Sequence, residues 1–253
     1  MNAIVLRLVP YREADVIATL FTRDLGKISG LARAARKSRR RFGGALGLLT
    51  LIDLELAERR RGQMYTLRGA QPVESFAELA TDMAAYAHAS YATELVRELT
   101  ADEQPDESLF DLLLALYREL RAGASVPMLR AFELETLALV GLMPVLDQCA
   151  ACGASDDDAL DEHAVLDPAK GGVLCRACAG RFRGPGARAL PSVSRRLLLE
   201  ARSAASLRAA RDIQAAPEAA AAARDALLAV ILAHVGKPLR SLEFISKLRG
   251  RGS

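Results

Sequence analysis

All four cysteines of the chain fall into two C-x-x-C pairs, and no other feature of the sequence constrains its fold as strongly. The pairs are Cys149 with Cys152 and Cys175 with Cys178. Two thiolates at this spacing can bind one metal ion from a tight turn, and a second such turn completes a tetrahedron. The segment between the pairs, residues 153–174, is acidic and rich in turn-forming residues, which favours a short ribbon over a helix. The spacing therefore predicts one Zn²⁺ ion held by the four cysteines.

Three other interpretations of these cysteines are weaker. Two disulfides would require an oxidising compartment, and nothing in the sequence indicates export. A redox-active C-x-x-C works as a single pair near a βαβ unit, and the sequence pattern shows no such unit. His163 lies between the pairs and could replace a cysteine, but four thiolates already complete a structural site. Because a closed four-thiolate site has no open position for water, we expect the zinc to be structural rather than catalytic.

The composition is that of a soluble protein with substantial cores. Its 253 residues, 51% of them hydrophobic, suffice for one large domain or for two to three small ones. The chain begins directly as a strand, without the basic segment and apolar stretch of a signal peptide. No apolar run in the sequence reaches the length needed to span a membrane. We therefore expect a cytoplasmic protein.

The first 75 residues have the pattern of a small β-barrel. Residues 50–57 show an imperfect period-two alternation, and Pro10 and Gly26 belong to turn signals. Five short strands in so short a segment suit a closed barrel, and an OB-fold has five strands, although another small barrel remains an alternative. The strands are expected at about 2–9, 15–22, 26–32, 48–57 and 63–70.

Beyond the barrel the apolar residues recur at helical spacing, so the predicted fold class is α+β with an inserted zinc ribbon. Pro127 stands in the first turn of one expected helix, a favoured position for proline. Helices are expected at about 78–100, 107–121 and 125–141, and again within 192–248. The predicted parts are the OB-fold at 1–75, the first part of a helical domain at 76–146, the zinc ribbon at 147–182 and the C-terminal part of the helical domain at 183–253.

Basic residues are concentrated in one segment of the predicted barrel. Between residues 27 and 52 there is no acidic residue, whereas seven basic ones occur: Lys27, Arg33, Arg36, Lys37, Arg39, Arg40 and Arg41. Without these seven, the chain would carry 27 basic against 31 acidic residues, so this segment alone makes it basic. A second run, Arg59, Arg60 and Arg61, falls at the turn between the last two predicted strands.

We interpret the basic segment as a nucleic-acid site. A run of charge is often only solvated surface, but seven cations without an anion repel one another and favour a polyanionic partner. Loops and one sheet face are where OB-folds bind nucleic acid. The candidates for stacking on bases are few, namely Phe21, Phe42 and Tyr65. We therefore expect binding dominated by phosphate contacts, with little reading of sequence.

The sequence argues against an enzyme. It contains neither the phosphate-binding loop G-x-x-x-x-G-K-[ST] nor the zinc-protease motif H-E-x-x-H. The P-C-x-x-C motif of zinc deaminases is also missing. Three histidines are few for acid–base chemistry.

Several segments together resemble the RecO family of bacterial recombination mediators. The resembling segments, which follow one another in the family's order over most of the chain, are Pro10–Asp15, Leu20–Thr22 with Gly26 and Lys27, Arg36–Arg39 with Phe42–Leu46, and Leu129–Leu134 followed by Gly141, Pro144 and the paired cysteines. Each segment alone is only moderately specific, and the last 70 residues or so add little.

The resemblance implies an OB-fold, a helical domain and a zinc module. It further implies a non-enzymatic protein of the nucleoid that binds single- and double-stranded DNA and anneals complementary strands. It implies cooperation with RecR and with single-stranded DNA-binding protein, so that RecA can load onto DNA during repair. Arg130 is a candidate for binding a partner's acidic tail, although it could be an ordinary surface arginine. The alternative function is a zinc-ribbon transcription or RNA-binding factor.

Overall fold

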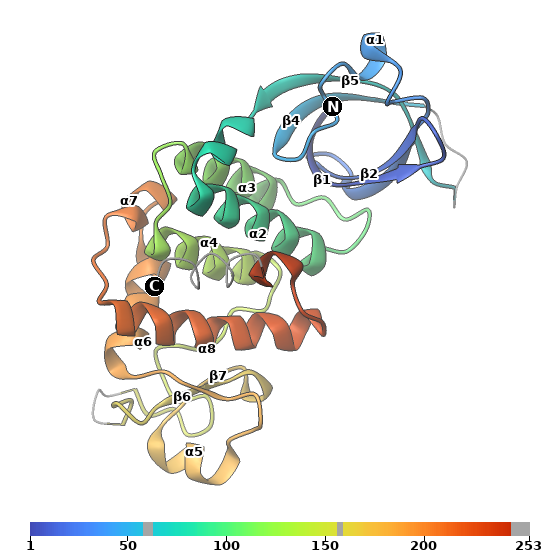
Figure 1. The fold of residues 1–253 in the computed structure, drawn as a ribbon. Coiled ribbons are helices and arrows are strands. Elements are labelled where there is room, and N and C mark those ends of the chain that lie inside the picture. Colours follow the sequence, from blue (N-terminus) through green and yellow to red (C-terminus); the bar gives the residue numbers. More distant parts are fainter. Residues whose placement is uncertain (58–62, 156–158, 244–253) are drawn as a thin grey trace. The chain divides into compact units, whose positions relative to one another are not determined.

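The computed structural model describes residues 1–57, 63–155 and 159–243, which form two compact units (Figure 1). The first unit contains Met1–Gly123 and the described residues from Ser241 onward, and the second contains Ala124–Arg240. This division groups two helices with the barrel. The division of the chain into separate parts near residues 76, 147 and 183 stays a prediction.

Five strands in the first unit close into a barrel with the order β1-β2-β3-β5-β4 (Figure 1). Neighbouring strands pair antiparallel except β3 and β5, which pair parallel, and β1 closes the barrel against β4. This arrangement confirms the predicted five-stranded OB-fold. The strands are β1 (Asn2–Tyr11), β2 (Asp15–Thr22), β3 (Gly26–Ala32), β4 (Thr50–Leu56) and β5 (Tyr65–Ser75).

The barrel core is filled by inward-facing residues such as Val5, Leu20 and Ile28, each at most 1% exposed. Gly26 begins β3 with a φ of +68°, and a Cβ there would lie 2.0 Å from the carbonyl oxygen of Gln104. Only glycine fits this close approach.

The fifth strand runs to Ser75, five residues beyond its predicted end, and passes through Pro72. Proline is tolerated there because this stretch of β5 pairs with β4 alone.

The connection between β3 and β4, residues 33–49, covers one end of the barrel. It contains a short helix, α1 (Arg39–Phe42). Phe42 is 3% exposed and Ala45 is fully buried, and both pack into the barrel core. The connection is therefore anchored to the barrel by apolar side chains.

Two helices complete the first unit. Asp82 adopts an extended backbone and accepts hydrogen bonds from the N–H groups of Ala84 and Ala85. This N-cap divides the single helix predicted at 78–100 into a 3₁₀ turn and an α-helix. Asp106 caps the next helix in the same way. The elements are η1 (Ala77–Thr81), α2 (Met83–Leu99) and α3 (Glu107–Leu120).

A cluster around Phe76 attaches α3 to the end of β5. Phe76 is fully buried, and its ring centroid lies 5.2 Å from that of Tyr117. The guanidinium of Arg121 lies 4.5 Å from the ring centroid of Phe76. Arg118 and Arg121 both donate to the carboxylate of Glu74. The Arg118 hydrogen bond holds the pKa of Glu74 below its usual value against the effect of burial, and Arg121 lowers it further. The link therefore stabilises the fold at neutral pH and is lost as the pH falls through that lowered pKa.

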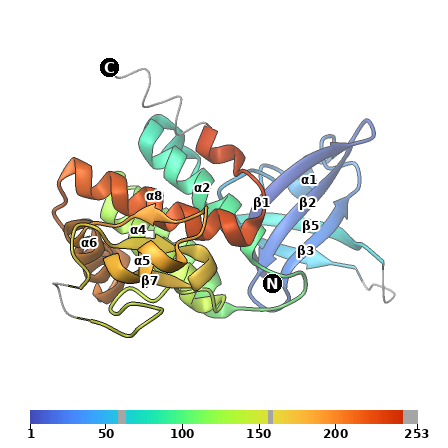
Figure 2. The same cartoon turned by 90° about the horizontal axis from the view of Figure 1, so that it is seen from below.

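In the second unit the helices pack against one another, and a small three-stranded ribbon lies against α8 (Figures 1 and 2). Helix α4 contacts α6 and α7, and α8 contacts α6 and the strands of the ribbon. Pro127 stands in the first turn of α4, as predicted, and α8 ends at Gly236 with a φ of +70°. The helices are α4 (Val126–Leu139), α6 (Ser192–Ser203), α7 (Leu207–Arg211) and α8 (Pro217–Val235).

We predict that Phe76→Ala lowers the free energy of unfolding by about 3–5 kcal/mol, because it leaves a cavity beneath Tyr117 and Arg121. Chemical denaturation followed by circular dichroism measures this loss. Val73→Ala is the control, since Val73 is 56% exposed and should change the stability little. Equal stability of the two variants would contradict a role for Phe76 in attaching α3.

Candidate metal centre and nucleic-acid interface

The two cysteine pairs lie on the ribbon of the second unit. Cys149 and Cys152 occupy the loop that follows α4. Cys175 lies between β7 and α5 as the N-cap residue of α5, and Cys178 stands in the first turn of α5. The strands form a sheet in the order β7-β6-β8. The elements are β6 (Val165–Asp167), η2 (Pro168–Lys170), β7 (Gly172–Leu174), α5 (Arg176–Phe182) and β8 (Arg188–Ala189).

The four sulfur atoms form one cluster, and all lie within 4.8 Å of one another. The distance from Cys152 Sγ to Cys175 Sγ is 3.9 Å. An ion about 2.3 Å from each of four tetrahedral sulfurs sets sulfur–sulfur distances of roughly 3.8 Å. Cys149, Cys175 and Cys178 are buried, while Cys152 is exposed. The cluster can therefore bind a metal ion, and the predicted grouping of these residues is confirmed.

Main-chain hydrogen bonds hold the first pair against the second. Ala150 N–H donates to Val173 O over 2.7 Å, which fixes the loop to β7. Gly153 has a φ of +77°, and its N–H donates to Cys149 O to close the turn. The N–H of Cys175 points at Cys149 Sγ over 3.4 Å. The backbone thus sets the sulfur geometry, with glycine where the turn requires a positive φ.

The thiols of the cluster differ in acidity. Burial disfavours the thiolate of Cys149, but N–H groups of Cys175, Ala151 and Cys152 donate to it and lower its pKa to about 6. Burial raises the pKa of Cys178 to about 12, and hydrogen bonds with the other three cysteines add to the effect. Four thiolates this close require a positive charge between them, and a divalent cation supplies it and deprotonates coordinating thiols.

A buried carboxylate supports the ribbon beside the cluster. Asp167 is fully buried, and its two oxygens accept hydrogen bonds from Ala169 N–H over 2.9 Å and Gly184 N–H over 2.7 Å. Sequence reasoning missed this role, although an Asp-Pro step is a known turn signal. His163 is exposed and does not belong to the cysteine cluster.

The structure brings most of the predicted basic residues together on the connection between β3 and β4. Five of them are exposed there: Arg33, Arg36, Lys37, Arg40 and Arg41. The backbone of Arg39 lies in the same segment, but its side chain is outside the described part of the structure. We call residues 33–41 the basic loop.

Local hydrogen bonds fix the shape of the basic loop. The carboxylate of Asp15 accepts from Ala34 N–H over 2.8 Å, and Ala34 has a φ of +54°. Arg41 Nη2 donates to Arg33 O over 2.8 Å, and its Nε donates to Ser38 Oγ over 3.2 Å. Arg41 therefore braces the loop. Among the described residues, the side chains of Arg33, Lys37 and Arg40 have no partner.

The described residues of this surface do not include two groups of predicted DNA-binding residues. Lys27 lies in β3 with its side chain 15% exposed, and its ammonium donates to the carbonyl oxygens of Arg97 and Thr100 and pairs with Asp102. Its charge is satisfied inside the first unit. The second group, Arg59, Arg60 and Arg61, lies outside the described residues.

The aromatic residues considered for stacking on bases are mostly unavailable. Phe21 is fully buried with its ring 6.1 Å from that of Phe110, and Phe42 is 3% exposed. Tyr65 is half-buried. Tyr11, which sequence reasoning did not single out for stacking, is 40% exposed at the end of β1, where the guanidinium of Arg12 lies 5.2 Å from its ring. In the sequence, the signal for the exposure of Tyr11 was its position beside a turn.

Arg130 is buried in α4 and is not an ordinary surface arginine. It is 4% exposed, and its Nη2 donates to Glu133 Oε1 over 2.9 Å. Its Nε and Nη1 have no hydrogen-bond partner within the described residues. A second arginine on the adjoining helix α6, Arg195, is also 4% exposed.

None of the helices that the structure describes combines the length and hydrophobicity required to cross a membrane.

Two family models match the chain almost from end to end. Residues 1–76 match the N-terminal part of recombination protein O, and residues 80–243 match its C-terminal part. The boundary between the two matches falls at the end of β5.

Curated proteins are similar over the whole chain. A DNA repair protein RecO of Anaeromyxobacter sp. (strain K) is 42% identical over 98% of this chain and 96% of its own length. The DNA repair protein RecO of Myxococcus xanthus is 38% identical over 98% of this chain and 96% of its own length. That of Symbiobacterium thermophilum is 35% identical over 98% and 97%. With a closed barrel, a four-cysteine cluster and full-length similarity of this kind, the chain belongs to the RecO family of DNA repair proteins.

Proposed function

We propose that the protein binds single- and double-stranded DNA, anneals complementary strands and, with RecR, helps RecA load onto DNA coated by single-stranded DNA-binding protein. The observation that carries this proposal is the basic loop, whose exposed cations are gathered at one end of an OB-fold barrel. The curated relatives are DNA repair proteins by name, which favours DNA over RNA as the polyanion.

The proposed mechanism is electrostatic. Two complementary strands repel each other through their phosphates, and a basic surface that holds both lowers this repulsion and raises their local concentration. Arg33, Lys37 and Arg40 are the residues best placed to contact phosphates, because their charges have no partner among the described residues. No covalent step and no nucleotide hydrolysis is needed, so we propose a mediator rather than an enzyme.

We infer that the cysteine cluster holds Zn²⁺. Four thiolates in a tetrahedral arrangement are the donor set typical of a structural zinc site. Its role would be to fix the loop of Cys149 to the end of β7, in addition to the hydrogen bond from Ala150 N–H to Val173 O. The ion supplies positive charge and cross-linking there, and the four thiolates leave no position for a substrate.

We further propose that Arg130 receives a carboxylate of the acidic C-terminal tail of single-stranded DNA-binding protein. Glu133 occupies one nitrogen of the guanidinium, while Nε and Nη1 are buried without a hydrogen-bond partner within the described residues. A buried donor without a partner costs free energy, and a carboxylate can accept two parallel hydrogen bonds from a guanidinium. Because both nitrogens are buried, the Arg130 side chain would have to turn toward the surface to meet such a tail, which would then relieve that cost.

Freshly reduced protein should contain about one zinc ion per chain, and Cys175→Ser should lower both the zinc content and the melting temperature, because metal binding is coupled to folding of the ribbon. Elemental analysis and calorimetry measure the two effects. Ser203→Ala, on the exposed end of α6, is the control. Purified wild-type protein without zinc, or with another metal in its place, would refute the assignment.

Replacing Arg33, Lys37 and Arg40 together by alanine should remove up to three phosphate contacts. Each contact on a single strand contributes about −0.7 to the slope of log affinity against log salt concentration, so the slope should fall in magnitude by about 2. Arg41 is kept because it braces the loop. Fluorescence anisotropy over a range of salt concentrations measures the slope, and strand annealing should weaken with it.

The matched control removes three exposed arginines of the second unit, Arg196, Arg208 and Arg240, and thus the same net charge. A folded basic-loop variant that behaves like this control would place the DNA site elsewhere, for example at Arg59, Arg60 and Arg61.

Arg130→Lys should weaken binding of an acidic C-terminal peptide about tenfold while leaving affinity for naked DNA unchanged. Lysine keeps the charge beside Glu133 but loses the planar fork that can bind a carboxylate through two hydrogen bonds. Titration calorimetry with the peptide measures the loss, and Arg196→Lys on the exposed face of α6 is the control. Unchanged peptide affinity in a folded Arg130→Lys protein would count against the proposal.

A further inference from the structure

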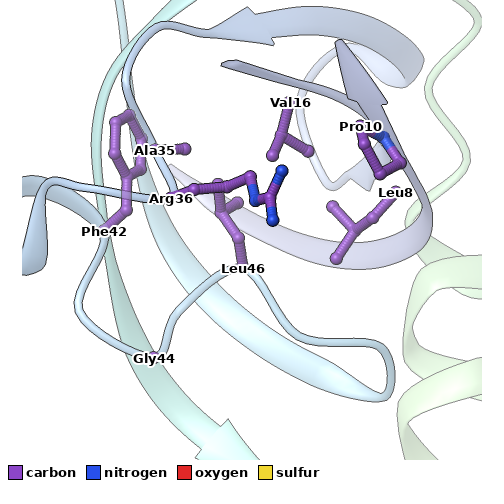
Figure 3. Close-up of a pocket in the computed structure, with 8 residues that line it drawn as sticks. All are labelled: Leu8, Pro10, Val16, Ala35, Arg36, Phe42, Gly44 and Leu46. Carbon is purple, nitrogen blue, oxygen red and sulfur yellow. The ribbon is translucent and has the colours of Figure 1, made fainter. Parts of the chain in front are cut away.

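An apolar pocket opens at the end of the barrel that carries the basic loop (Figure 3). Its volume is about 310 Å³, and its eight lining residues come from β1, β2 and the connection between β3 and β4. Leu8 and Val16 form one wall and Phe42 and Leu46 another. Among the described residues that line it, Arg36 alone is charged. Apolar walls with few polar groups are typical of ligand sites.

Arg36 crosses the pocket with most of its hydrogen-bonding capacity unused. Figure 3 shows its side chain reaching from the basic loop toward Val16 and Leu8. Among the described residues, its guanidinium makes one hydrogen bond, a long one of 3.3 Å from Nη1 to Glu13 O. Its main chain is fixed, because its N–H donates to Ala14 O over 3.0 Å. The guanidinium can therefore turn toward a ligand while its anchor stays in place.

The surroundings of the pocket define the chemistry of that ligand. Arg33, Lys37 and Arg40 are exposed on the same loop, and Arg41 lies with its guanidinium 5.4 Å from the ring of Phe42. The described residues that line the pocket include no carboxylate. A fitting ligand combines a flat apolar group with several negative charges spaced along a chain. Single-stranded DNA has this combination, and a row of cations matches repeated phosphates better than a single carboxylate.

We propose that this pocket takes one unstacked nucleobase of a DNA strand whose phosphates lie on the basic loop. The base lies between the apolar walls, and the planar guanidinium of Arg36 stacks on its face or binds its edge. This inference rests on the proposed DNA binding and adds to it a preference for single-stranded over double-stranded DNA. A duplex must unpair and unstack a base to fill the pocket, whereas a single strand offers one at little cost.

The test compares two oligomers of equal length, oligothymidylate and a chain of abasic tetrahydrofuran residues, which carry the same phosphates. Wild-type protein should bind oligothymidylate about tenfold more tightly, which corresponds to about 1.4 kcal/mol. Ala35→Leu, which fills the pocket without changing charge, should abolish this difference while the affinity for the abasic chain stays the same. Fluorescence anisotropy at one salt concentration measures all four affinities.

Ala80→Leu is the matched control, because Ala80 is exposed on η1 and lies outside the pocket. It should keep the tenfold difference. Should Ala35→Leu fail to fold, as judged by circular dichroism, Leu46→Phe fills the same pocket from another side.

The outcomes separate this proposal from the one on which it rests. Equal wild-type affinity for the two oligomers would overturn the base pocket and leave DNA binding intact. Failure to bind either oligomer would overturn both. If Ala35→Leu leaves the tenfold difference in place but abolishes binding of an acidic, apolar peptide, then the pocket is a protein-binding site and the proposal is wrong.

Discussion

Parallel pairing of β3 with β5 is the constraint on which the first unit depends. It closes the barrel while β4 lies on the far side of β5, so the chain between β3 and β4 must cross an open end of the barrel. An uncovered end would expose the core, and the connection covers it by burying Phe42 and Ala45. The basic residues are carried on this cover, which is why they occupy a fixed surface rather than a free tail.

Both candidate sites hold side chains of like charge close together. In the ribbon, backbone hydrogen bonds gather four thiols within 4.8 Å, although thiolates at that distance repel one another. In the basic loop, Asp15 and Arg41 fix the main chain so that exposed cations remain neighbours. In each case the fold holds like charges close together, and in the proposed functions an ion or a polyanion of opposite charge would complete the site.

Features of the sequence that act locally predicted the structure well. The barrel strands follow from period-two patterning and turn residues, and the cysteine cluster follows from spacing along the chain. Features that depend on distant contacts could not be predicted in this way. Lys27 was counted with the basic loop by sequence proximity, yet its ammonium is held by carbonyl groups near residue 100. The burial of Arg130 depends on the packing of other helices against α4, and the pocket requires three separate segments to meet.

The hydrogen bonds that brace the basic loop bear on the rates at which DNA strands would bind and dissociate. Because Asp15, Ala14 and Arg41 fix the loop through hydrogen bonds that need no ligand, little conformational entropy remains to be lost when a strand arrives. Attraction between exposed cations and phosphates then accelerates encounter, and dissociation depends on the number of phosphates held. If it binds DNA as proposed, such a surface would gain strands rapidly and would release them faster the fewer phosphates it holds. In the annealing proposed for this chain, the rate at which strands are released would set how many times each copy of the protein can act.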